Sequence, residues 1–443
     1  MYSCIYTLYQ FYPNPIENVY LLFSIRILKD IKIMSYLYKM PNILILENIN
    51  TSAIEVYKNK DYTYIHLKKS LEEEELIYKL NINKIDVLCI RSKTKITRAV
   101  IDSVPSLKAI GCYCIGTNQV DLDYCCSRGI PVFNCPYMNT RSVAELTISH
   151  IIALSRKIGD KNIEMHNGFW NKSHIGCYEI RGKTLGIIGY GHVGSQVSIL
   201  AEAMGMNVFY FDILNVLALG NARKCNTLDE LLGRSDFVSL HVPLTPLTKE
   251  LIGETELSKM KCGSYLLNLS RGAVVDVNAV SIALKSGFLA GSSFDVYPKE
   301  PKKNSNNFIS TLQKCPNTIL TPHIGGATEE AQQSIGVDVS NKIINYLTIG
   351  DTFNSVNFPQ IQIDKLNDVI YIKNIHKNNP GVMSKLNSIF GSFNINIIRQ
   401  YLDTKKDIGY SVSVVSVDDI ENLTSITNMI GTFQSSIRTE IFI

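Results

Sequence analysis

Three ionisable side chains lie in short polar segments that follow apolar runs in the second half of the chain. Arg271 lies in SRGAVVD, Glu300 in DVYPKEP and His323 in TPHIGG. Imidazole has an ordinary pKa near neutrality and can remove a hydroxyl proton, a carboxylate beside it can orient it, and a guanidinium can hold a carboxylate with two hydrogen bonds. Together these groups suit the oxidation of a secondary alcohol next to a carboxylate. Each alone also has a structural explanation, as a surface charge, a loop acid or a packed histidine.

A glycine motif precedes these segments. GYGHVG supplies Gly189, Gly191 and Gly194 directly after the apolar run 184–188 and before a helical segment. Glycines at such positions permit a tight turn and let backbone N–H groups at a helix N-terminus approach a pyrophosphate. The context of strand, glycines and helix therefore predicts a dinucleotide site.

An acidic residue at the end of the next apolar run indicates which dinucleotide binds. Asp212 lies at about the 20-residue distance expected of the carboxylate that hydrogen-bonds the ribose 2′-hydroxyl. This carboxylate would repel the 2′-phosphate of NADP. The nearby Arg223 and Lys224 are interpreted as solvated surface residues. The sequence therefore predicts NAD as the cofactor.

The motifs GYGHVG, SRGAVVD, DVYPKEP and TPHIGG, in this order and spacing, resemble those of the D-isomer-specific 2-hydroxyacid dehydrogenases. The resemblance implies hydride transfer to or from C2 of a small 2-hydroxy acid, with Arg271, Glu300 and His323 as the catalytic residues. It also implies a substrate domain that closes against a Rossmann cofactor domain, and no metal ion. The residues expected to contact NAD are Gly189, Gly191, His192, Val193, Gly194, Asp212, Leu269, Ser270, Arg271, Asp295, His323, Ile324, Gly325 and Gly326.

Segments of the first domain narrow the substrate. RSKTKIT, the stretch that begins GCYCIGTNQVDLDYC, and WNK are similar to the branch of this family that oxidises D-3-phosphoglycerate to 3-phosphohydroxypyruvate, the first step of phosphorylated L-serine biosynthesis. The implied substrate contacts are Arg91, Ser92, Asn139 and Lys172. A doubly anionic phosphate needs such donors and cations. Lys172, like the pair Lys68 and Lys69, could equally be an ordinary exposed lysine.

The last segment, residues 368–443, has the strand-helix-strand-strand-helix-strand pattern of a ferredoxin-like module. IHKNNPGVMSKLNSIF followed by FNINIIRQYL resembles the ACT domain of serine-sensitive members of the family. The resemblance implies that His376, Asn378 and Asn396 bind L-serine, that L-serine inhibits by feedback, and that ACT modules pair in a homotetramer. Taken alone, HKNNPG could be a polar loop before a helix with Pro380 in its first turn.

Two other functions stay open. The chain could act on another 2-hydroxy acid, such as glycerate or 2-hydroxyglutarate, and could reduce 2-oxoglutarate as a side activity. It could also be a non-catalytic NAD sensor or corepressor that keeps the fold. The presence of Arg271, Glu300 and His323 favours an enzyme, and Arg91 with Ser92 favours a phosphorylated substrate.

Apolar runs that alternate with amphipathic stretches must position these residues. The runs 43–47, 86–92, 107–113 and 130–136 predict a first parallel sheet, and the runs 184–188, 207–212, 237–242, 264–270, 291–296 and 318–323 predict a second. Between them, Ser142 and Glu145 suggest a capping box at the start of a long helix. The predicted fold class is α/β, with a flavodoxin-like substrate domain, a Rossmann NAD-binding domain and a ferredoxin-like ACT domain. The predicted limits are 42–138 with 324–350 for the substrate domain, 139–323 for the NAD-binding domain, 351–367 for a linker and 368–443 for the ACT domain.

Composition excludes several classes of protein. The hydrophobic content of 45% and charged content of 19% are ordinary for a globular chain. A net charge of +4, from 44 basic and 40 acidic residues spread along the chain, is too small for a nucleic-acid footprint, and no membrane partner is expected. The 11 cysteines lack zinc-knuckle spacing and are interpreted as free thiols in a reducing cytoplasm.

The first residues need a separate interpretation. Residues 1–41 lack the basic start of a signal peptide, and charges interrupt their apolar runs before a membrane span could form. We expect an extension outside the domains whose presence in the native protein stays open, with Met34 or Met40 as alternative starts.

Overall fold

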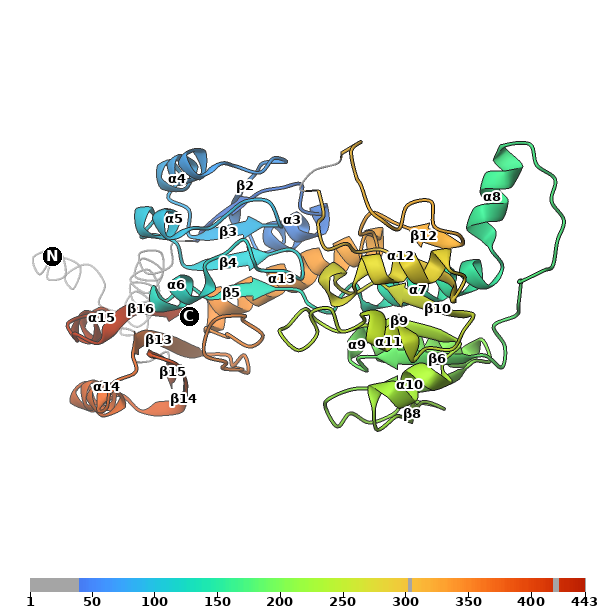
Figure 1. The fold of residues 1–443 in the computed structure, drawn as a ribbon. Coiled ribbons are helices and arrows are strands. Elements are labelled where there is room, and N and C mark those ends of the chain that lie inside the picture. Colours follow the sequence, from blue (N-terminus) through green and yellow to red (C-terminus); the bar gives the residue numbers. More distant parts are fainter. Residues whose placement is uncertain (1–39, 302–304, 417–421, 443) are drawn as a thin grey trace, which may run out of the picture. The chain divides into compact units, whose positions relative to one another are not determined.

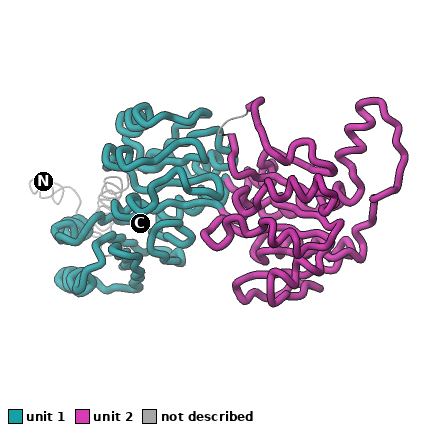
Figure 2. Tube along the Cα trace, viewed as in Figure 1, with its two compact units in different colours: residues 1–135, 336–443 teal, residues 136–335 magenta. Residues whose placement is uncertain are grey.

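The computed structural model divides the chain into two compact units (Figure 2). The described residues are 40–301, 305–416 and 422–442. The first unit comprises residues 1–135 and 336–443, and the second comprises residues 136–335. The interpretation of residues 1–41 as an extension falls almost wholly outside the described residues. The domain limits stay predictions, because the first sheet and the C-terminal module share one unit.

The first unit contains a five-stranded parallel sheet (Figure 1). In spatial order its strands are β2 (Thr63–His66), β1 (Asn42–Ile45), β3 (Val87–Ile90), β4 (Ala109–Cys112) and β5 (Val132–Asn134). The helices that pack on it are α3 (Thr51–Lys58), α4 (Glu73–Ile82), α5 (Arg98–Ser103), α6 (Leu122–Ser127) and α13 (Glu329–Ile349). The strand order 2-1-3-4-5 is that of flavodoxin-like folds. Every residue of β3 and β4 is buried because helices cover both faces.

The second unit is built on a seven-stranded sheet in which every strand pair is parallel. In spatial order its strands are β12 (Thr318–Leu320), β11 (Leu289–Phe294), β10 (Ser264–Asn268), β9 (Phe237–Leu240), β6 (Thr184–Ile188), β7 (Asn207–Phe211) and β8 (Arg223–Lys224). Its helices are α7 (Thr140–Ser155), α8 (Ile158–His166), α9 (His192–Ala203), α10 (Leu228–Arg234), α11 (Glu254–Ser258), the 3-10 turn η1 (Gly272–Val274) and α12 (Val277–Lys285). When these strands are numbered 1 to 7 along the chain, starting from β6, their spatial order is 3-2-1-4-5-6-7. This is the Rossmann order 3-2-1-4-5-6 with one further strand.

Alternation along the central strands explains why they are apolar throughout. Tyr265 and Leu267 of β10 pack into one hydrophobic cluster, and Leu266 between them packs into the other. Successive side chains of a strand point to opposite faces, so a sheet covered on both faces needs apolar residues at every position. The predicted α/β class and its two parallel sheets are confirmed.

Helix α7 begins earlier than the sequence suggested. Its first residue is Thr140 and its N-cap residue is Asn139, so Ser142 lies inside the first turn. The Ser142 hydroxyl instead lies 2.7 Å from that of Thr328, and Glu145 accepts a hydrogen bond from Arg141. The predicted capping box is therefore wrong, because both of its side chains have other partners.

The C-terminal module is a four-stranded antiparallel sheet with two helices on one face. In spatial order its strands are β14 (Ile397–Lys405), β15 (Ile408–Ser416), β13 (Val369–Lys377) and β16 (Ser436–Phe442), and its helices are α14 (Val382–Ser392) and α15 (Leu423–Gly431). Helix α14 starts after Gly381, so Pro380 precedes the helix. The order and connections are those of the predicted ferredoxin-like module.

The two faces of β13 have different neighbours. Ile370 and Ile372 pack against the module's helices. Lys373 points the other way and lies 3.9 Å from the centre of the Tyr346 ring in α13. Ile375, on the same side as Lys373, lies beside Gly129 at the end of α6. The sheet face opposite the helices therefore packs on the part of the same unit that holds the five-stranded sheet.

None of the helices in the described ranges combines the length and apolar character that crossing a bilayer requires.

Candidate active site

The loop after β6 has the geometry that a pyrophosphate requires. Gly189 has φ +90°, and a Cβ there would lie 2.6 Å from the His241 carbonyl oxygen. A Cβ on Gly194 would overlap the carbonyl of Gly189. By contrast, a Cβ on Gly191 would meet nothing within 4 Å, and α9 begins at the next residue. Gly189 and Gly194 thus permit the tight turn, while Gly191 leaves open space at a helix N-terminus.

Asp212 is fixed beside this loop. It follows β7 directly, and its two oxygens accept hydrogen bonds from the backbone N–H groups of Tyr190 and Leu214, both at 2.8 Å. The carboxylate therefore cannot turn away from the glycine loop. Its position at the end of the second strand suits contact with a ribose hydroxyl, so the residues present fit NAD.

The other predicted cofactor contacts lie on loops at the same edge of the sheet. His192 and Val193 open α9, Leu269 and Ser270 follow β10, and Ile324, Gly325 and Gly326 follow β12. The His192 ring also packs against Tyr137, with ring centres 3.9 Å apart and the ring planes tilted by 34°. These contacts stay predictions.

His323 and Glu300 form a close pair. The distance from His323 Nδ1 to Glu300 Oε2 is 2.8 Å, and Glu300 Oε1 accepts the Tyr297 N–H at 3.0 Å. A carboxylate can only accept here, so Nδ1 carries the proton and Nε2 is the basic nitrogen. The hydrogen bond that His323 donates to Glu300 raises the pKa of His323, against the opposite effect of burial. Burial alone would raise the pKa of Glu300, but His323 and the Tyr297 N–H lower it below its ordinary value.

Arg271 lies close enough to influence both partners. Its positive charge lowers the pKa values of Glu300 and His323. The loop that carries it packs tightly against the Glu300 loop, because a Cβ on Gly272 would overlap the Tyr297 carbonyl. The three predicted catalytic residues are therefore brought together within one unit.

Buried polar residues that the sequence analysis did not single out hold these loops. Asn268 is fully buried, with its Oδ1 accepting from Ser270 and its amide donating to the Arg271 carbonyl at 3.0 Å. Tyr297 donates from its hydroxyl to the Thr321 carbonyl. A polar residue at the end of an otherwise apolar strand, as in SYLLN, is the signal that could have revealed Asn268.

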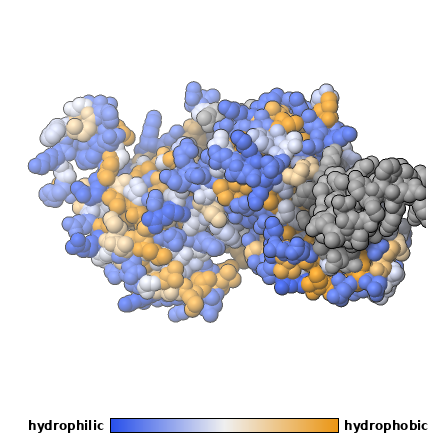
Figure 3. All heavy atoms as spheres, turned by 180° about the vertical axis from the view of Figure 1, so that it is seen from behind, coloured by the Kyte–Doolittle hydropathy of each residue, from blue (hydrophilic) through white to orange (hydrophobic). Residues whose placement is uncertain are grey.

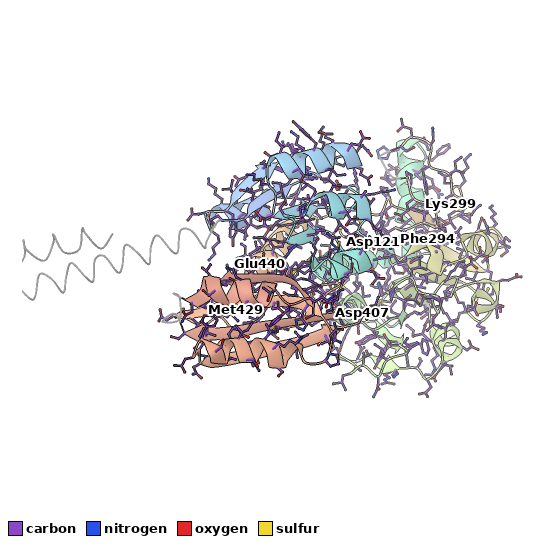
Figure 4. All side chains as sticks on the ribbon, turned by 90° about the vertical axis from the view of Figure 1, so that its left-hand side faces the viewer. Asp121, Phe294, Lys299, Asp407, Met429 and Glu440 are labelled. Carbon is purple, nitrogen blue, oxygen red and sulfur yellow. The ribbon has the colours of Figure 1, made fainter. Side chains whose placement is uncertain are left out.

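Asp295 fixes the segment that carries His323. It follows β11, whose last residue, Phe294, is labelled in Figure 4. Its buried carboxylate accepts from the Thr321 hydroxyl at 2.6 Å and from the N–H groups of Ile324 and Gly325, both at 2.8 Å. This clamp holds the backbone on either side of His323, whose own φ is +56°. The predicted contact of Asp295 with the cofactor stays a prediction.

The predicted substrate contacts fall in both units. In the first unit, Arg91 and Ser92 follow β3 directly. In the second unit, Asn139 is buried and its amide lies against Gly326, while Lys172 is exposed in the segment after α8. Asn139 therefore contacts the loop that follows His323.

The C-terminal module contains a cavity of about 360 Å³. Its lining residues are His376, Asn378, Asn379, Gly381, Val382, Met383, Ser384, Leu402 and Thr404. His376 Nδ1 lies 2.9 Å from Asn374 Oδ1, and burial lowers the pKa of the imidazole. Two of the three predicted effector residues thus share a cavity, and the third, Asn396, is exposed just before β14, outside this lining.

Comparison with known proteins agrees with this geometry. Residues 148–325 match the family model of the D-isomer specific 2-hydroxyacid dehydrogenase NAD binding domain. Residues 372–437 match the AHAS small subunit-like ACT domain. A solved D-lactate dehydrogenase from Aquifex aeolicus, complexed with NAD and lactic acid, superposes with a TM-score of 0.57 at 28% identity, over 69% of this chain and 95% of that one. These matches define the class as NAD-dependent 2-hydroxyacid dehydrogenases with an ACT domain.

Curated relatives specify the family further. The D-3-phosphoglycerate dehydrogenase of Dictyostelium discoideum is 50% identical over 399 residues, covering 90% of this chain and 96% of the relative. That of Escherichia coli strain K12 is 48% identical over 377 residues, covering 85% and 91%. The chain belongs to the D-3-phosphoglycerate dehydrogenase family and is an NAD-dependent enzyme.

Proposed function

We propose that the enzyme oxidises D-3-phosphoglycerate to 3-phosphohydroxypyruvate and that L-serine binds its ACT module and inhibits it. The contact between His323 Nδ1 and Glu300 Oε2, at 2.8 Å, carries the chemical part of the proposal. This contact orients the His323 imidazole, which is the proposed base, beside Arg271. The names of the relatives support the phosphorylated substrate.

The proposed mechanism assigns one task to each catalytic side chain. NAD, when bound at the glycine loop, supplies the acceptor for the C2 hydride. His323 Nε2 removes the proton from the C2 hydroxyl, and Glu300 stabilises the imidazolium that results. Arg271 holds the substrate carboxylate with its guanidinium. In the reverse direction the protonated His323 returns the proton to the C2 oxygen.

Arg91 and Ser92 supply phosphate recognition in this proposal. They lie at the carboxyl end of β3, and ligands of open α/β sheets bind outside the carboxyl ends of strands. A guanidinium and a hydroxyl suit a phosphate dianion because both donate hydrogen bonds and one carries positive charge. Asn139 and Lys172 are the substrate contacts proposed for the second unit.

The first experiment measures NADH consumption with 3-phosphohydroxypyruvate, hydroxypyruvate and 2-oxoglutarate, each with and without L-serine. We expect the phosphorylated substrate to give the highest kcat/KM, with 2-oxoglutarate as a slower side substrate. A preference for an unphosphorylated acid would keep the chemistry and refute the roles of Arg91 and Ser92. If His323→Ala left turnover unchanged, the assignment of His323 as the catalytic base would fail.

The ACT cavity supports an amino acid as effector. Its volume of about 360 Å³ and its amide and imidazole groups suit the carboxylate and ammonium of a small amino acid. Serine should inhibit wild-type enzyme and raise its thermal midpoint, and His376→Ala should lose both effects with basal kcat retained. Serine at saturating concentration that changed neither activity nor midpoint would end the regulatory proposal.

A homotetramer is the proposed assembly. Apolar side chains are exposed on α8 and the segment after it, including Ile163 at 61%, Trp170 at 81% and Ile175 at 77%. The segment lies at the upper left of Figure 3, where apolar and polar residues mix on the surface. Such side chains favour burial against another subunit. A monomer by analytical ultracentrifugation would overturn this proposal.

A further inference from the structure

Glu47 is a buried carboxylate beneath the loop that carries Arg91 and Ser92. It lies two residues after β1 and its exposed fraction is 7%. Its φ is +63°, a conformation unfavourable for a residue with a Cβ. Contacts must therefore hold this residue in place.

Both carboxylate oxygens of Glu47 bind backbone of that loop. Oε2 accepts the Lys93 N–H at 2.9 Å, and Oε1 accepts the Thr94 N–H at 2.7 Å. These residues come directly after Arg91 and Ser92. One side chain thus satisfies two consecutive backbone donors and sets the course of the loop where it leaves β3.

Two further bonds complete the support. The Glu47 N–H donates to the Lys69 carbonyl at 3.2 Å, which ties the end of β1 to the end of β2. The Gln119 amide donates to the Arg91 carbonyl at 2.5 Å. The carboxyl ends of β1, β2 and β3 therefore meet at Glu47, and the loop is held from two sides.

We propose that Glu47 is a positioning residue that holds the Arg91–Ser92 loop in the conformation that binds the phosphate of the substrate. The inference rests on the proposed function, because it takes this loop to be the phosphate-binding loop. Glu47 does not contact substrate in this assignment. Both Glu47 oxygens accept hydrogen bonds from backbone N–H groups of the loop. These donors stabilise the negative charge of the carboxylate near an anionic ligand.

The carboxylate chemistry makes the assignment specific. A glutamine has one acceptor oxygen and an NH2 group, so it can satisfy only one of the two backbone donors. The other N–H, part-buried at Lys93 or buried at Thr94, would lose its acceptor, and the loop would move to relieve it. Glu47→Gln should therefore shift Arg91 and Ser92, whereas Glu47→Asp keeps both acceptors on a shorter side chain.

The matched control is Asp351. Its carboxylate likewise accepts two backbone N–H groups, from Phe353 at 2.8 Å and from Ile363 at 3.0 Å, and it lies in the segment before the ACT module. Asp351→Asn removes the same kind of bond away from the Arg91–Ser92 loop. The thermal midpoint of Asp351→Asn shows how much stability is lost when such bonds are removed away from the proposed phosphate-binding loop.

The experiment compares steady-state kinetics of full-length wild type, Glu47→Gln, Glu47→Asp and Asp351→Asn with 3-phosphohydroxypyruvate and with hydroxypyruvate. We expect Glu47→Gln to raise KM for the phosphorylated substrate by about tenfold with kcat within about threefold, because it weakens binding without touching the reacting atoms. KM for hydroxypyruvate should stay near the wild-type value. Glu47→Asp should give a smaller rise in the same direction, and it is the deciding variant if Glu47→Gln does not fold.

Two outcomes separate this inference from the proposed function. A wild-type enzyme without preference for the phosphorylated substrate would refute the proposed function and this inference with it. A wild-type preference that Glu47→Gln and Glu47→Asp retain, with changes no larger than those of Asp351→Asn, would refute the role of Glu47 alone.

Discussion

At the scale of single residues, the His323–Glu300 contact determines the pH at which the site can accept a proton. Glu300 raises the pKa of His323, and only the neutral imidazole is a base. Oxidation of the hydroxy acid should therefore rise as pH increases through that raised pKa. Reduction needs the imidazolium and should show the opposite dependence.

Glu300→Gln tests this contact. The amide can still accept from Nδ1 but carries no charge, so the pKa of His323 should fall and the acidic limb of kcat/KM for oxidation should move to lower pH. We also expect kcat to fall by about 10- to 100-fold, because the imidazolium is no longer stabilised. The measurement is a pH–rate profile, with the exposed Glu254→Gln as control. An unchanged acidic limb would show that Glu300 does not set this pKa.

Motifs predicted the catalytic residues but not their supports. Arg271, Glu300 and His323 could be predicted because their types match one chemistry and each follows an apolar run. Thr321 and Tyr297 could not, since their role is to satisfy groups of loops whose course is known only from the folded structure. Glu47 belongs to the same group, because its partners are 46 and 47 positions away in sequence.

At the scale of elements, the glycines of the loop after β6 have two separate roles, which are binding of the cofactor and folding of the turn. Gly191 is open to the space predicted for the pyrophosphate and has an ordinary φ of −79°, whereas Gly194 is in contact with the Gly189 carbonyl. Gly191 is therefore expected to serve cofactor binding, and Gly194 to serve folding of the turn.

Alanine substitutions should distinguish these roles. Gly191→Ala should raise KM for NAD about tenfold or more while the thermal midpoint changes little, because its Cβ meets only cofactor space. Gly194→Ala should lower the midpoint by about 4 °C or more, since its Cβ would force the turn apart. Differential scanning fluorimetry and NAD titrations check both. Equal loss of stability in the two variants would contradict the separation.

Element types were predictable from apolar runs, whereas element ends depended on distant partners. The run 318–323 predicted a strand to His323, but β12 ends at Leu320. The Thr321 carbonyl is taken by the Tyr297 hydroxyl, and the N–H groups that follow His323 go to Asp295. Backbone groups that are bound in this way cannot form further strand-to-strand hydrogen bonds, so β12 ends. The local sequence pattern does not reveal these distant partners.

At the scale of the whole molecule, a buried charge cluster joins the ACT sheet to the part of the first unit that holds the five-stranded sheet. Lys373, fully buried, pairs with Glu440, which also lies 3.4 Å from Lys108. Arg438 donates to the Leu107 carbonyl at 3.0 Å. Glu440 is labelled in Figure 4 on β16. Burial alone would raise the pKa of Glu440, but Lys373, Lys108 and Arg438 lower it to about 2.

Glu440→Gln should destabilise the protein in a pH-dependent way. Because the folded pKa lies below the ordinary value, the charge of Glu440 stabilises the fold above about pH 4.5, and this contribution is lost as pH falls toward 2. At pH 7 we expect a loss of about 3 kcal/mol, since a buried Lys373 is left without its anion. Thermal midpoints of wild type and variant should converge on acidification.

A surface pair in the same unit is the control. Lys406 and Asp123 are 2.7 Å apart, but their side chains are 70% and 83% exposed. Solvent screens such pairs, so Asp123→Asn should cost less than about 1 kcal/mol at any pH. If Asp123→Asn matched Glu440→Gln, burial would not be the cause of the difference.

The alternation of side chains along β13 has a consequence for the proposed inhibition by L-serine. His376 lines the ACT cavity, and its neighbour in sequence, Ile375, lies beside Gly129, which follows α6. Under that proposal, a ligand that moves the His376 imidazole would also shift the backbone of Ile375, whose side chain packs beside Gly129. In the proposed inhibition by L-serine, the residue that lines the effector cavity and the residue that packs on Gly129 are therefore neighbours on one strand, and no further element is needed between them.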